Sequence, residues 1–188
     1  MTRYAAEDEG QALLGPQGTG LLLCSGDAVK TLLEGGTGSA SAQTEMPAFL
    51  PDRLEAGTHN VPGIAGLLEG LRFIENKGTD AILRHERRLA QRAVRGLARM
   101  PGVRVFGSKN LINQAGVISF QIPSVDCESV GEMLGQRDIA VRAGLHCSPT
   151  AHQTAETFEA GTVRISFSIF NQEREVDRFL MELARLTV

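Results

Sequence analysis

The spacing of apolar residues changes along this chain, and the change constrains the fold more than any other feature. From Asn60 to about Pro101, apolar residues recur at every third or fourth position, as they do in amphipathic helices. Between Val103 and Ile122 the period falls to two, which is typical of strands. A last stretch over 173–186 returns to the helical period. A chain with these periods must build its core from helices and strands together.

The expected elements follow from these periods and from turn residues. Helices are predicted over 27–33, from Asn60 to Gly78, over 80–100, from Ser124 or Asp126 to about Gln136, and over 173–186. Strands are predicted over 20–24, 103–106, 116–122, 139–142 and 162–167, with 143–161 as a loop. This order predicts an α/β sandwich with a mostly antiparallel sheet and helices on one face.

Composition limits the classes of function. The chain has 188 residues, of which 42% are hydrophobic, enough for one core and part of a second domain. Its net charge is −3 and it has no basic block, so no nucleic-acid partner is expected. No stretch is apolar and long enough for a membrane span or a signal peptide. We therefore expect a cytoplasmic protein, in a compartment that keeps thiols reduced.

The cysteines argue against a disulfide framework and against a metal site. There are three, Cys24, Cys127 and Cys147, and none is part of a C-x-x-C pair. His146 and Cys147 are neighbours in sequence, which is poor geometry for two ligands of one metal ion, so no metal is predicted. The loop over 34–57 is unusually long, which is typical of functional or disordered loops. Its apolar residues, such as Phe49, favour an ordered loop that packs against a partner surface.

Several separated motifs carry a resemblance to a known family. They are LLGPQGTG (13–20), RLEAGTHNVPGIAGLLEGL (53–71), and VRAGLHCSPTAH followed by GTVRISFSIFNQEREVDRFL (141–180). In order and spacing the chain from residue 13 onward is similar to the cysteine desulfurase branch of the class V aminotransferases. The resemblance implies a fold-type I transferase small domain at 58–188 and a remnant of the large cofactor-binding domain at 13–57. Residues 1–12 are expected to be an atypical, loose lead-in.

The resemblance also implies a reaction. Family members use pyridoxal phosphate to remove sulfur from L-cysteine, leaving L-alanine and a persulfide on an enzyme cysteine. Cys147 stands at that cysteine's position, in a loop beside His146 and near Arg142. Two interpretations of Arg142 stay open, a loop-stabilising residue and an active-site residue. Cys24 and Cys127 are predicted to be core thiols.

Two further positions match the family's binding residues. Arg164 corresponds to the arginine that binds the substrate carboxylate; the alternative is a strand-edge arginine in a surface ion pair. Thr58, after Gly57, corresponds to the threonine that reaches the cofactor phosphate of the partner subunit. The alternative is that Thr58 caps the following helix, and both roles can hold together. The glycine-rich run at 35–39 resembles a loop that approaches the partner's active site. His152 is expected to be structural or at the surface.

One position departs from the family. Relatives have a lysine just before LLGPQGTG that forms the Schiff base with the cofactor, and here that position is Gln11. An amide nitrogen is not nucleophilic, so covalent attachment of pyridoxal phosphate is not expected in this chain alone. The family's earlier region, which holds most of the cofactor site, has no counterpart before Ala12. These two differences predict a truncated or replaced start.

Two main interpretations follow. The first is a cysteine desulfurase portion, incomplete and inactive alone, that works as a homodimer or with a complementing large-domain chain and passes sulfur to an acceptor protein. The second is a non-catalytic remnant that serves as a dimerisation or persulfide-carrier module. Another enzyme of the class V aminotransferase fold is a more distant alternative. Truncation also predicts that the apolar residues of 20–24 and 34–57 are exposed, disordered or buried in an oligomer.

Overall fold

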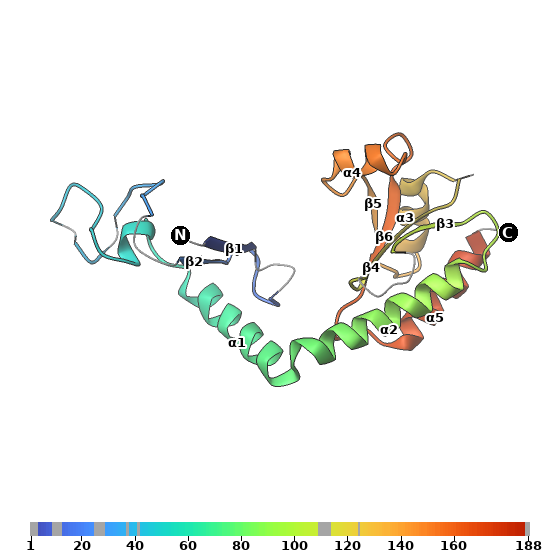
Figure 1. The fold of residues 1–188 in the computed structure, drawn as a ribbon, viewed down its shortest axis with the longest axis horizontal. Helices are drawn as coiled ribbons and strands as arrows, with labels where there is room; N and C mark the ends of the chain where they lie inside the picture. The colour runs from blue at the N-terminus through green and yellow to red at the C-terminus, as the bar shows by residue number, and fades with distance from the viewer. Residues whose placement is uncertain are drawn as a thin grey trace. The chain divides into compact units, whose positions relative to one another are not determined.

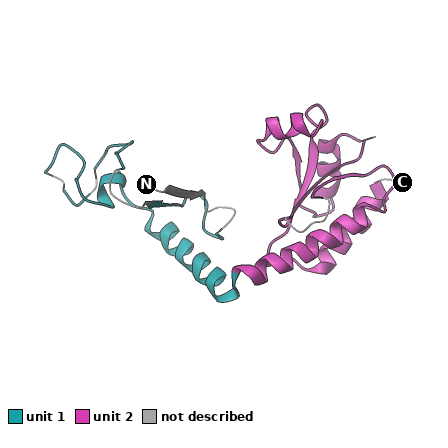
Figure 2. Ribbon diagram, viewed as in Figure 1, with its two compact units in different colours: residues 1–78 teal, residues 79–188 magenta. Residues whose placement is uncertain are grey.

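The computed structural model describes residues 4–8, 13–24, 29–36, 38–40, 42–108, 114–123 and 125–186 (Figure 1). By its internal contacts the chain divides into two units, residues 1–78 (unit 1) and residues 79–188 (unit 2), as Figure 2 shows. The resemblance places a boundary between the family's two domains at residues 57 and 58. This boundary is not defined by internal contacts, and it stays a prediction. No helix in the described part of the chain is long and apolar enough to cross a membrane.

Unit 1 begins with a two-stranded hairpin. Strands β1 (Tyr4–Asp8) and β2 (Gly20–Cys24) pair antiparallel, with Tyr4 opposite Cys24 and Asp8 opposite Gly20. The predicted strand over 20–24 is therefore confirmed. Strand β1 lies inside the segment predicted to be a loose lead-in. Residues 1–3 and 9–12 of that segment, among them Gln11, lie outside the described residues.

The long segment after β2 has little regular structure. Within its described residues one short 3-10 helix forms, η1 (Asp52–Leu54). The helix predicted over 27–33 is absent from the described part of that range, 29–33. Leu32 is 93% exposed and Leu33 is also exposed, so these residues have no surface to pack against. A short helix without tertiary contacts is unstable, because packing supplies most of helical stability.

Unit 1 exposes many of its large apolar side chains. On β2 and in the long loop the exposed ones are Leu22, Leu23, Leu32, Leu33, Phe49 and Leu50. Met46 and Leu54 are half-buried. Isolated surface leucines are ordinary, but a series of them along one segment is unusual for a self-contained domain. Of the three outcomes that truncation predicts for these residues, exposure is the one seen in the described part of the strand and the loop. Phe49, which was expected to pack against another surface, is exposed in this chain.

Helix α1 (Val61–Lys77) follows the loop, close to its predicted limits. The Asn60 side chain caps its N-terminus by accepting a hydrogen bond from the Gly63 N–H at 3.0 Å. The suggestion that Thr58 caps this helix is therefore wrong: an amide oxygen one turn before Gly63 reaches the free N–H, and Thr58 lies too early. Gly78, with a φ of 78°, ends the helix as predicted.

Helix α1 packs closely against the chain segment that precedes β2. A side chain at Gly70 would collide with the carbonyl oxygen of Leu13, and one at Gly66 with the ring of Pro16. The rest of the predicted apolar stripe is only partly covered. Leu67 is buried, whereas Ile64 and Leu68 are exposed. The helical prediction is thus confirmed, but much of the stripe has no partner among the described residues.

Unit 2 is built on a four-stranded sheet. Its strands are β3 (Arg104–Phe106), β4 (Val117–Gln121), β5 (Arg142–Gly144) and β6 (Thr162–Ser166), in the spatial order β3-β4-β6-β5. Every pair in it is antiparallel, which confirms the predicted sheet. Strand β5 starts later than the predicted 139–142. The Ile139 N–H instead donates to the Leu134 carbonyl as the chain leaves the preceding helix.

Three helices cover one face of this sheet: α2 (Thr79–Leu97), α3 (Cys127–Gly135) and α5 (Glu173–Leu186). Alternation along β4 and β6 turns Ile118, Phe120, Val163 and Ile165 toward them. The Phe120 ring meets the Phe179 ring edge-on, with centroids 5.8 Å apart. The largest fully buried side chains of this core also include Leu89, Leu97, Val130, Leu134, Val176 and Leu183. The core arrangement confirms the predicted sandwich.

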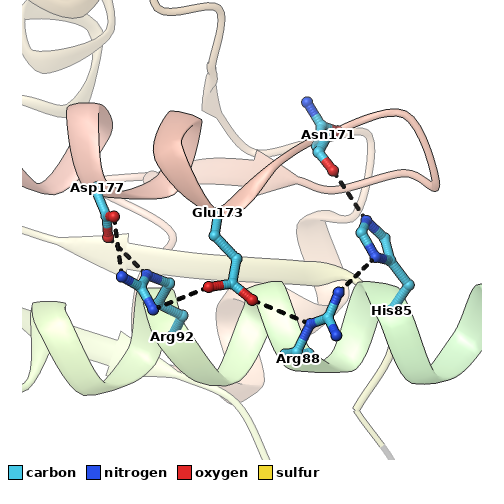
Figure 3. A network of polar contacts seen from close by, with 6 residues as sticks. All are labelled: His85, Arg88, Arg92, Asn171, Glu173 and Asp177. Atoms are coloured by element: carbon cyan, nitrogen blue, oxygen red, sulfur yellow. Dashed lines mark hydrogen bonds and ion pairs between the residues drawn. The ribbon is translucent and has the colours of Figure 1, made fainter.

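Charged side chains join α2 to the start of α5 (Figure 3). Arg92 holds Asp177 with two hydrogen bonds, of 2.6 and 2.9 Å, and reaches Glu173 at 3.3 Å. The Glu173 carboxylate also pairs with Arg88 at 3.2 Å, and one ring nitrogen of His85 lies 2.9 Å from the Asn171 carbonyl oxygen. Exposed ion pairs contribute little stability each, so the network mainly fixes how the two helices align.

A further short helix lies on the other face of the sheet. Helix α4 (Pro149–Thr154) forms inside 143–161, which was predicted to be a loop. Six residues that begin with a proline give no helical period, so the sequence pattern does not reveal it. Between α4 and the sheet lies a cavity of about 160 Å³, lined in part by Phe106, Ser119 and Thr162. This face carries the candidate site.

Candidate active site

Cys147 lies in a tight turn that joins β5 to α4. The Ser148 N–H donates to the Leu145 carbonyl at 2.9 Å and closes the turn. His146 and Cys147 both have left-handed backbone conformations, with φ of 52° and 58°. Cys147 is exposed and is not part of a disulfide. The turn therefore presents the thiol to a reaction partner, which a reactive cysteine requires.

A guanidinium group stands beside this thiol. Nη2 of Arg142, on β5, lies 3.7 Å from Sγ of Cys147. A cation next to an accessible sulfur is the setting in which reactive cysteines are found. Of the two interpretations of Arg142, the contact favours the active-site one.

Arg164 faces the same site from the neighbouring strand. In the β5–β6 register Arg142 lies directly opposite Arg164, so both side chains leave the same face of the sheet. Neither arginine has a salt bridge among the described residues, and the buried Nε of Arg164 has no hydrogen-bond partner there. The surface ion pair considered for Arg164 is thus not formed. Like charges placed opposite each other repel, and an anion between them relieves the repulsion.

His146 turns away from its sequence neighbour. Its Nε2 lies 3.0 Å from the Thr162 hydroxyl on β6, and its buried Nδ1 has no partner among the described residues. Burial, reinforced by the positive charge of Arg164, lowers the pKa of His146 below its usual value, so the ring is neutral at pH 7. The Nε2 atom of His146 therefore contacts Thr162 and not the Cys147 thiol.

His152 is buried rather than at the surface. It lies on α4, and its Nδ1 is 2.8 Å from the Thr157 hydroxyl, which is itself buried. Its ring lies 5.6 Å from the His146 ring, measured between centroids. Of the two expected settings, the structural one fits: His152 ties α4 to the chain that follows it.

The other cysteines differ from Cys147. Cys127 is buried at the start of α3, and burial raises the pKa of its thiol, so it is less reactive. The core-thiol prediction is confirmed for this residue. The Cys24 side chain lies outside the described residues, so its prediction stays untested. In the described part of the chain, no three His, Cys, Asp or Glu side chains gather into a metal-binding group.

Thr58 and Gly57 lie in unit 1, before α1. Both are exposed, and Gly57 has a φ of 89°, a conformation that favours glycine. The Gly57 N–H donates to the Gly36 carbonyl at 2.7 Å and so ties the start of α1 to the glycine-rich run at 35–39. Within unit 2 the structure brings Cys147, Arg142 and Arg164 together, while the proposed phosphate contacts belong to the other unit.

The family of the chain follows from comparison with known proteins. The family model described as aminotransferase class-V matches residues 9–179. The chain belongs to the class-V aminotransferase family. This confirms the resemblance drawn from the motifs around Cys147, and it places both units of the chain in the same family.

Several relatives carry the name cysteine desulfurase. A probable cysteine desulfurase 2 of Mycobacterium leprae is 34% identical over 181 residues, which cover 94% of this chain and 43% of the relative. A solved cysteine desulfurase of Thermococcus onnurineus NA1 is 31% identical with a TM-score of 0.77, covering 98% and 46% of the two chains. The cysteine desulfurase CsdA of Escherichia coli is 30% identical with a TM-score of 0.79, covering 94% and 45%.

These comparisons confirm the predicted fold class and its partial extent. The chain spans less than half the length of the curated and solved relatives described above. The fold is that of a part of the pyridoxal-phosphate-dependent cysteine desulfurases, with the antiparallel sheet of unit 2 at its centre.

Sequence reasoning missed two hydroxyl groups at the site. Thr162 contacts His146, and Thr157 contacts His152. Thr162 lies inside the quoted motif that begins at Gly161 but was given no role, and Thr157 lies between the motifs. One signal was available for Thr162: it stands two residues before Arg164 on a strand, so both share a face. Thr157 follows α4 and carries no such signal.

Proposed function

We propose that this chain forms the sulfur-accepting part of a cysteine desulfurase, with the Cys147 thiolate as the acceptor. The observation that carries the proposal is the exposed Cys147 thiol, 3.7 Å from a guanidinium nitrogen of Arg142, with Arg164 directly opposite. The family and the names of the relatives support it. The class of substrate is L-cysteine or a similar amino acid.

The two arginines would orient the substrate. A guanidinium group binds a carboxylate through two parallel hydrogen bonds, which fixes the direction of the whole amino acid. Arg164 is half-buried and its Nε has no partner among the described residues, so its side chain is held in a position to bind one anion. Arg142 touches the thiol and lies opposite Arg164, which brings the carboxylate of a bound amino acid and the attacking sulfur to the same face.

The transfer step balances without an external oxidant. The Cys147 thiolate attacks the sulfur of the substrate cysteine, and a sulfur–sulfur bond forms while the substrate's carbon–sulfur bond breaks. The electron pair of the broken bond stays on carbon, which takes up a proton to become the methyl group of alanine. Cys147 is left as a persulfide, ready to pass its outer sulfur to an acceptor protein.

Among the described residues, Thr58 is the candidate for binding the cofactor, at its phosphate. The exposed Thr58 hydroxyl has no hydrogen bond among the described residues and lies just before a helix N-terminus, where an anion is favoured. The aldehyde end needs an amine, and the corresponding residue is Gln11, which lies outside the described residues. Pyridoxal phosphate would supply an electron sink where residues outside this chain hold it.

A second function, carriage of a persulfide without desulfuration, is favoured by Gln11. An accessible thiol beside a cation reacts with sulfur donors whether or not a cofactor is present. For either function we propose a homodimer or a complementing large-domain chain as the partner, with Thr58 serving the partner's cofactor phosphate. We also propose a cytoplasmic setting, because a persulfide-forming thiol needs a reducing compartment.

The two functions are separated by one set of measurements on the purified chain. With pyridoxal phosphate and L-cysteine, we expect no imine absorbance and no alanine release from the chain alone. With a complementing large-domain chain from a relative, desulfuration predicts alanine release that Cys147→Ser abolishes. A polysulfide donor should place a persulfide on Cys147 in both cases, detected by mass spectrometry of its peptide.

Cys127→Ser is the matched control, because Cys127 is buried in the same unit. Cys127→Ser should leave persulfide formation on Cys147 and alanine release unchanged. Persulfide formation that survives Cys147→Ser at the wild-type level would contradict the assignment of Cys147. Alanine release that never appears with the complementing chain, while Cys147 still takes up sulfur, would leave carriage as the function.

A further inference from the structure

The Cys147 turn stands in a conformation that needs support. Two consecutive residues, His146 and Cys147, are left-handed, and neither is glycine. Each such residue is less stable than in a right-handed conformation, so the pair persists only where its surroundings hold it. Cys147 itself is exposed, so its own side chain adds little packing. Polar contacts of its neighbours therefore provide much of the support.

One of these contacts runs from the turn to the sheet. The His146 ring reaches the Thr162 hydroxyl at 3.0 Å, and Thr162 is only 3% exposed. Thr162 is fixed in the register of β6, opposite Gly144 on β5. The hydrogen bond therefore connects the residue before Cys147 to a rigid position two residues from Arg164. Within the described residues of the turn, 145–148, no other side chain forms a hydrogen bond to β6.

A second pair supports the first. The His152 ring lies against the His146 ring and is held by Thr157. Both His152 and Thr157 are buried, so α4 is tied down directly after the turn. The His146 ring is thus confined on two sides, by a hydroxyl group from β6 and by a ring from α4. Both contacts act on the residue that directly precedes Cys147 in the turn.

We propose that Thr162 is a positioning residue: through its hydrogen bond to His146 it holds the Cys147 thiol beside Arg142 and Arg164. This inference rests on the proposed function, in which the thiol must meet a substrate whose carboxylate these arginines bind. Thr162 touches neither the substrate nor the sulfur in this role. It acts only through His146 and the turn.

The test compares two alkylating reagents at Cys147. Iodoacetate is an anion and iodoacetamide is neutral. The iodoacetate rate divided by the iodoacetamide rate therefore reports how much positive charge surrounds the thiol. We expect Thr162→Val to lower this ratio about five-fold, the factor that one unit charge at about 4 Å in water corresponds to. Thr162→Ser keeps the hydroxyl and should restore the wild-type ratio. Rates are read on the Cys147 peptide by mass spectrometry.

A merely structural role would not change the ratio, because looser packing speeds both reagents alike. Thr150→Val, at an exposed position on α4, is the matched control and should leave the ratio unchanged. If Thr162→Val fails to fold by circular dichroism, His146→Asn takes its place. Asparagine tolerates the left-handed backbone, but its shorter side chain ends before Thr162, so the same five-fold fall is expected.

Arg142→Gln separates this inference from the proposed function. If it lowers the ratio while Thr162→Val and His146→Asn do not, the positioning role is overturned and the proposed function stands. If Arg142→Gln leaves the ratio unchanged, the charged setting proposed for Cys147 is wrong, and the inference fails with it. A fall in all three variants, with Thr162→Ser like wild type, supports both.

Discussion

Units 1 and 2 contain similar apolar residues and use them differently. In unit 2, Phe120 and Leu183 are fully buried, because a four-stranded sheet and three amphipathic helices supply complementary apolar faces. In unit 1, Leu32, Phe49 and Ile64 are exposed. A two-stranded hairpin with one helix has too little apolar surface to cover itself. A segment therefore buries its apolar residues only where a second apolar face packs against it, however many apolar residues it contains.

The same difference divides the candidate site. Cys147, Arg142 and Arg164 are arranged by unit 2 itself, through the β5–β6 register and the turn before α4. Thr58 stands exposed before α1 in unit 1, without a hydrogen bond among the described residues. The proposed sulfur-accepting chemistry therefore depends on a closed unit, and the proposed phosphate contact depends on a surface that other residues have to complete.

The largest expected effect is in the core of unit 2. Phe120→Ala removes a fully buried ring packed against Phe179 and should cost about 3–5 kcal/mol of unfolding free energy. Leu32→Ala, at the most exposed leucine of unit 1, should change it by less than about 0.5 kcal/mol. Urea unfolding and hydrogen exchange in β4 measure both. Equal losses of unfolding free energy in the two variants would contradict the difference between units 1 and 2.

Gly70→Ala tests whether unit 1 has any tight packing. Alanine normally stabilises a helix relative to glycine, but here the added methyl group collides with the Leu13 carbonyl oxygen. We expect the stability of unit 1 to fall by about 1–3 kcal/mol, as at other overpacked sites. Faster amide hydrogen exchange in residues 13–24 would show this loss. Gly135→Ala, where nothing lies within 4 Å, is the control and should stabilise α3 slightly. A neutral Gly70→Ala would mean that segment 13–16 is not fixed on α1.

Asn60→Ala should lower the stability of helix α1 by about 1 kcal/mol, because it removes the side-chain cap on the Gly63 N–H. Thr58→Ala should leave helix stability unchanged, since Thr58 is not the cap. Hydrogen exchange over the first turn of α1 distinguishes the two. A destabilising Thr58→Ala would return this threonine to the capping role and weaken its assignment to a phosphate.

The smallest effect is a pH dependence at the surface of unit 2. The hydrogen bonds from Arg92 hold the pKa of Asp177 below its usual value. The folded state thus favours the carboxylate, and this stabilisation is present above the usual pKa and lost as the pH falls through the lowered one. Asp177→Asn should therefore be less stable than wild type at pH 7, with the difference vanishing in acid. A stability difference that persists unchanged into acid would contradict this origin.

The periods in the sequence predicted most elements because they record which faces are buried. Glu173–Leu186 was predicted to the residue, since Val176, Phe179 and Leu183 mark one face of a helix. Strand β5 and helix α4 are too short to show a period, so one was misplaced and the other missed. The helix expected at 27–33 failed over its described part because its leucines have no partner surface.

The sequence by itself identified the family and suggested the roles proposed for Cys147 and Arg164, because these depend on motifs of neighbouring residues. The resemblance also aligned Gln11 with a lysine of relatives, a prediction that does not depend on packing. Only the tertiary structure put Arg142 opposite Arg164 and joined His146 to Thr162. These contacts link positions 16 to 22 residues apart, and strand register, which the whole core fixes, decides which side chains meet.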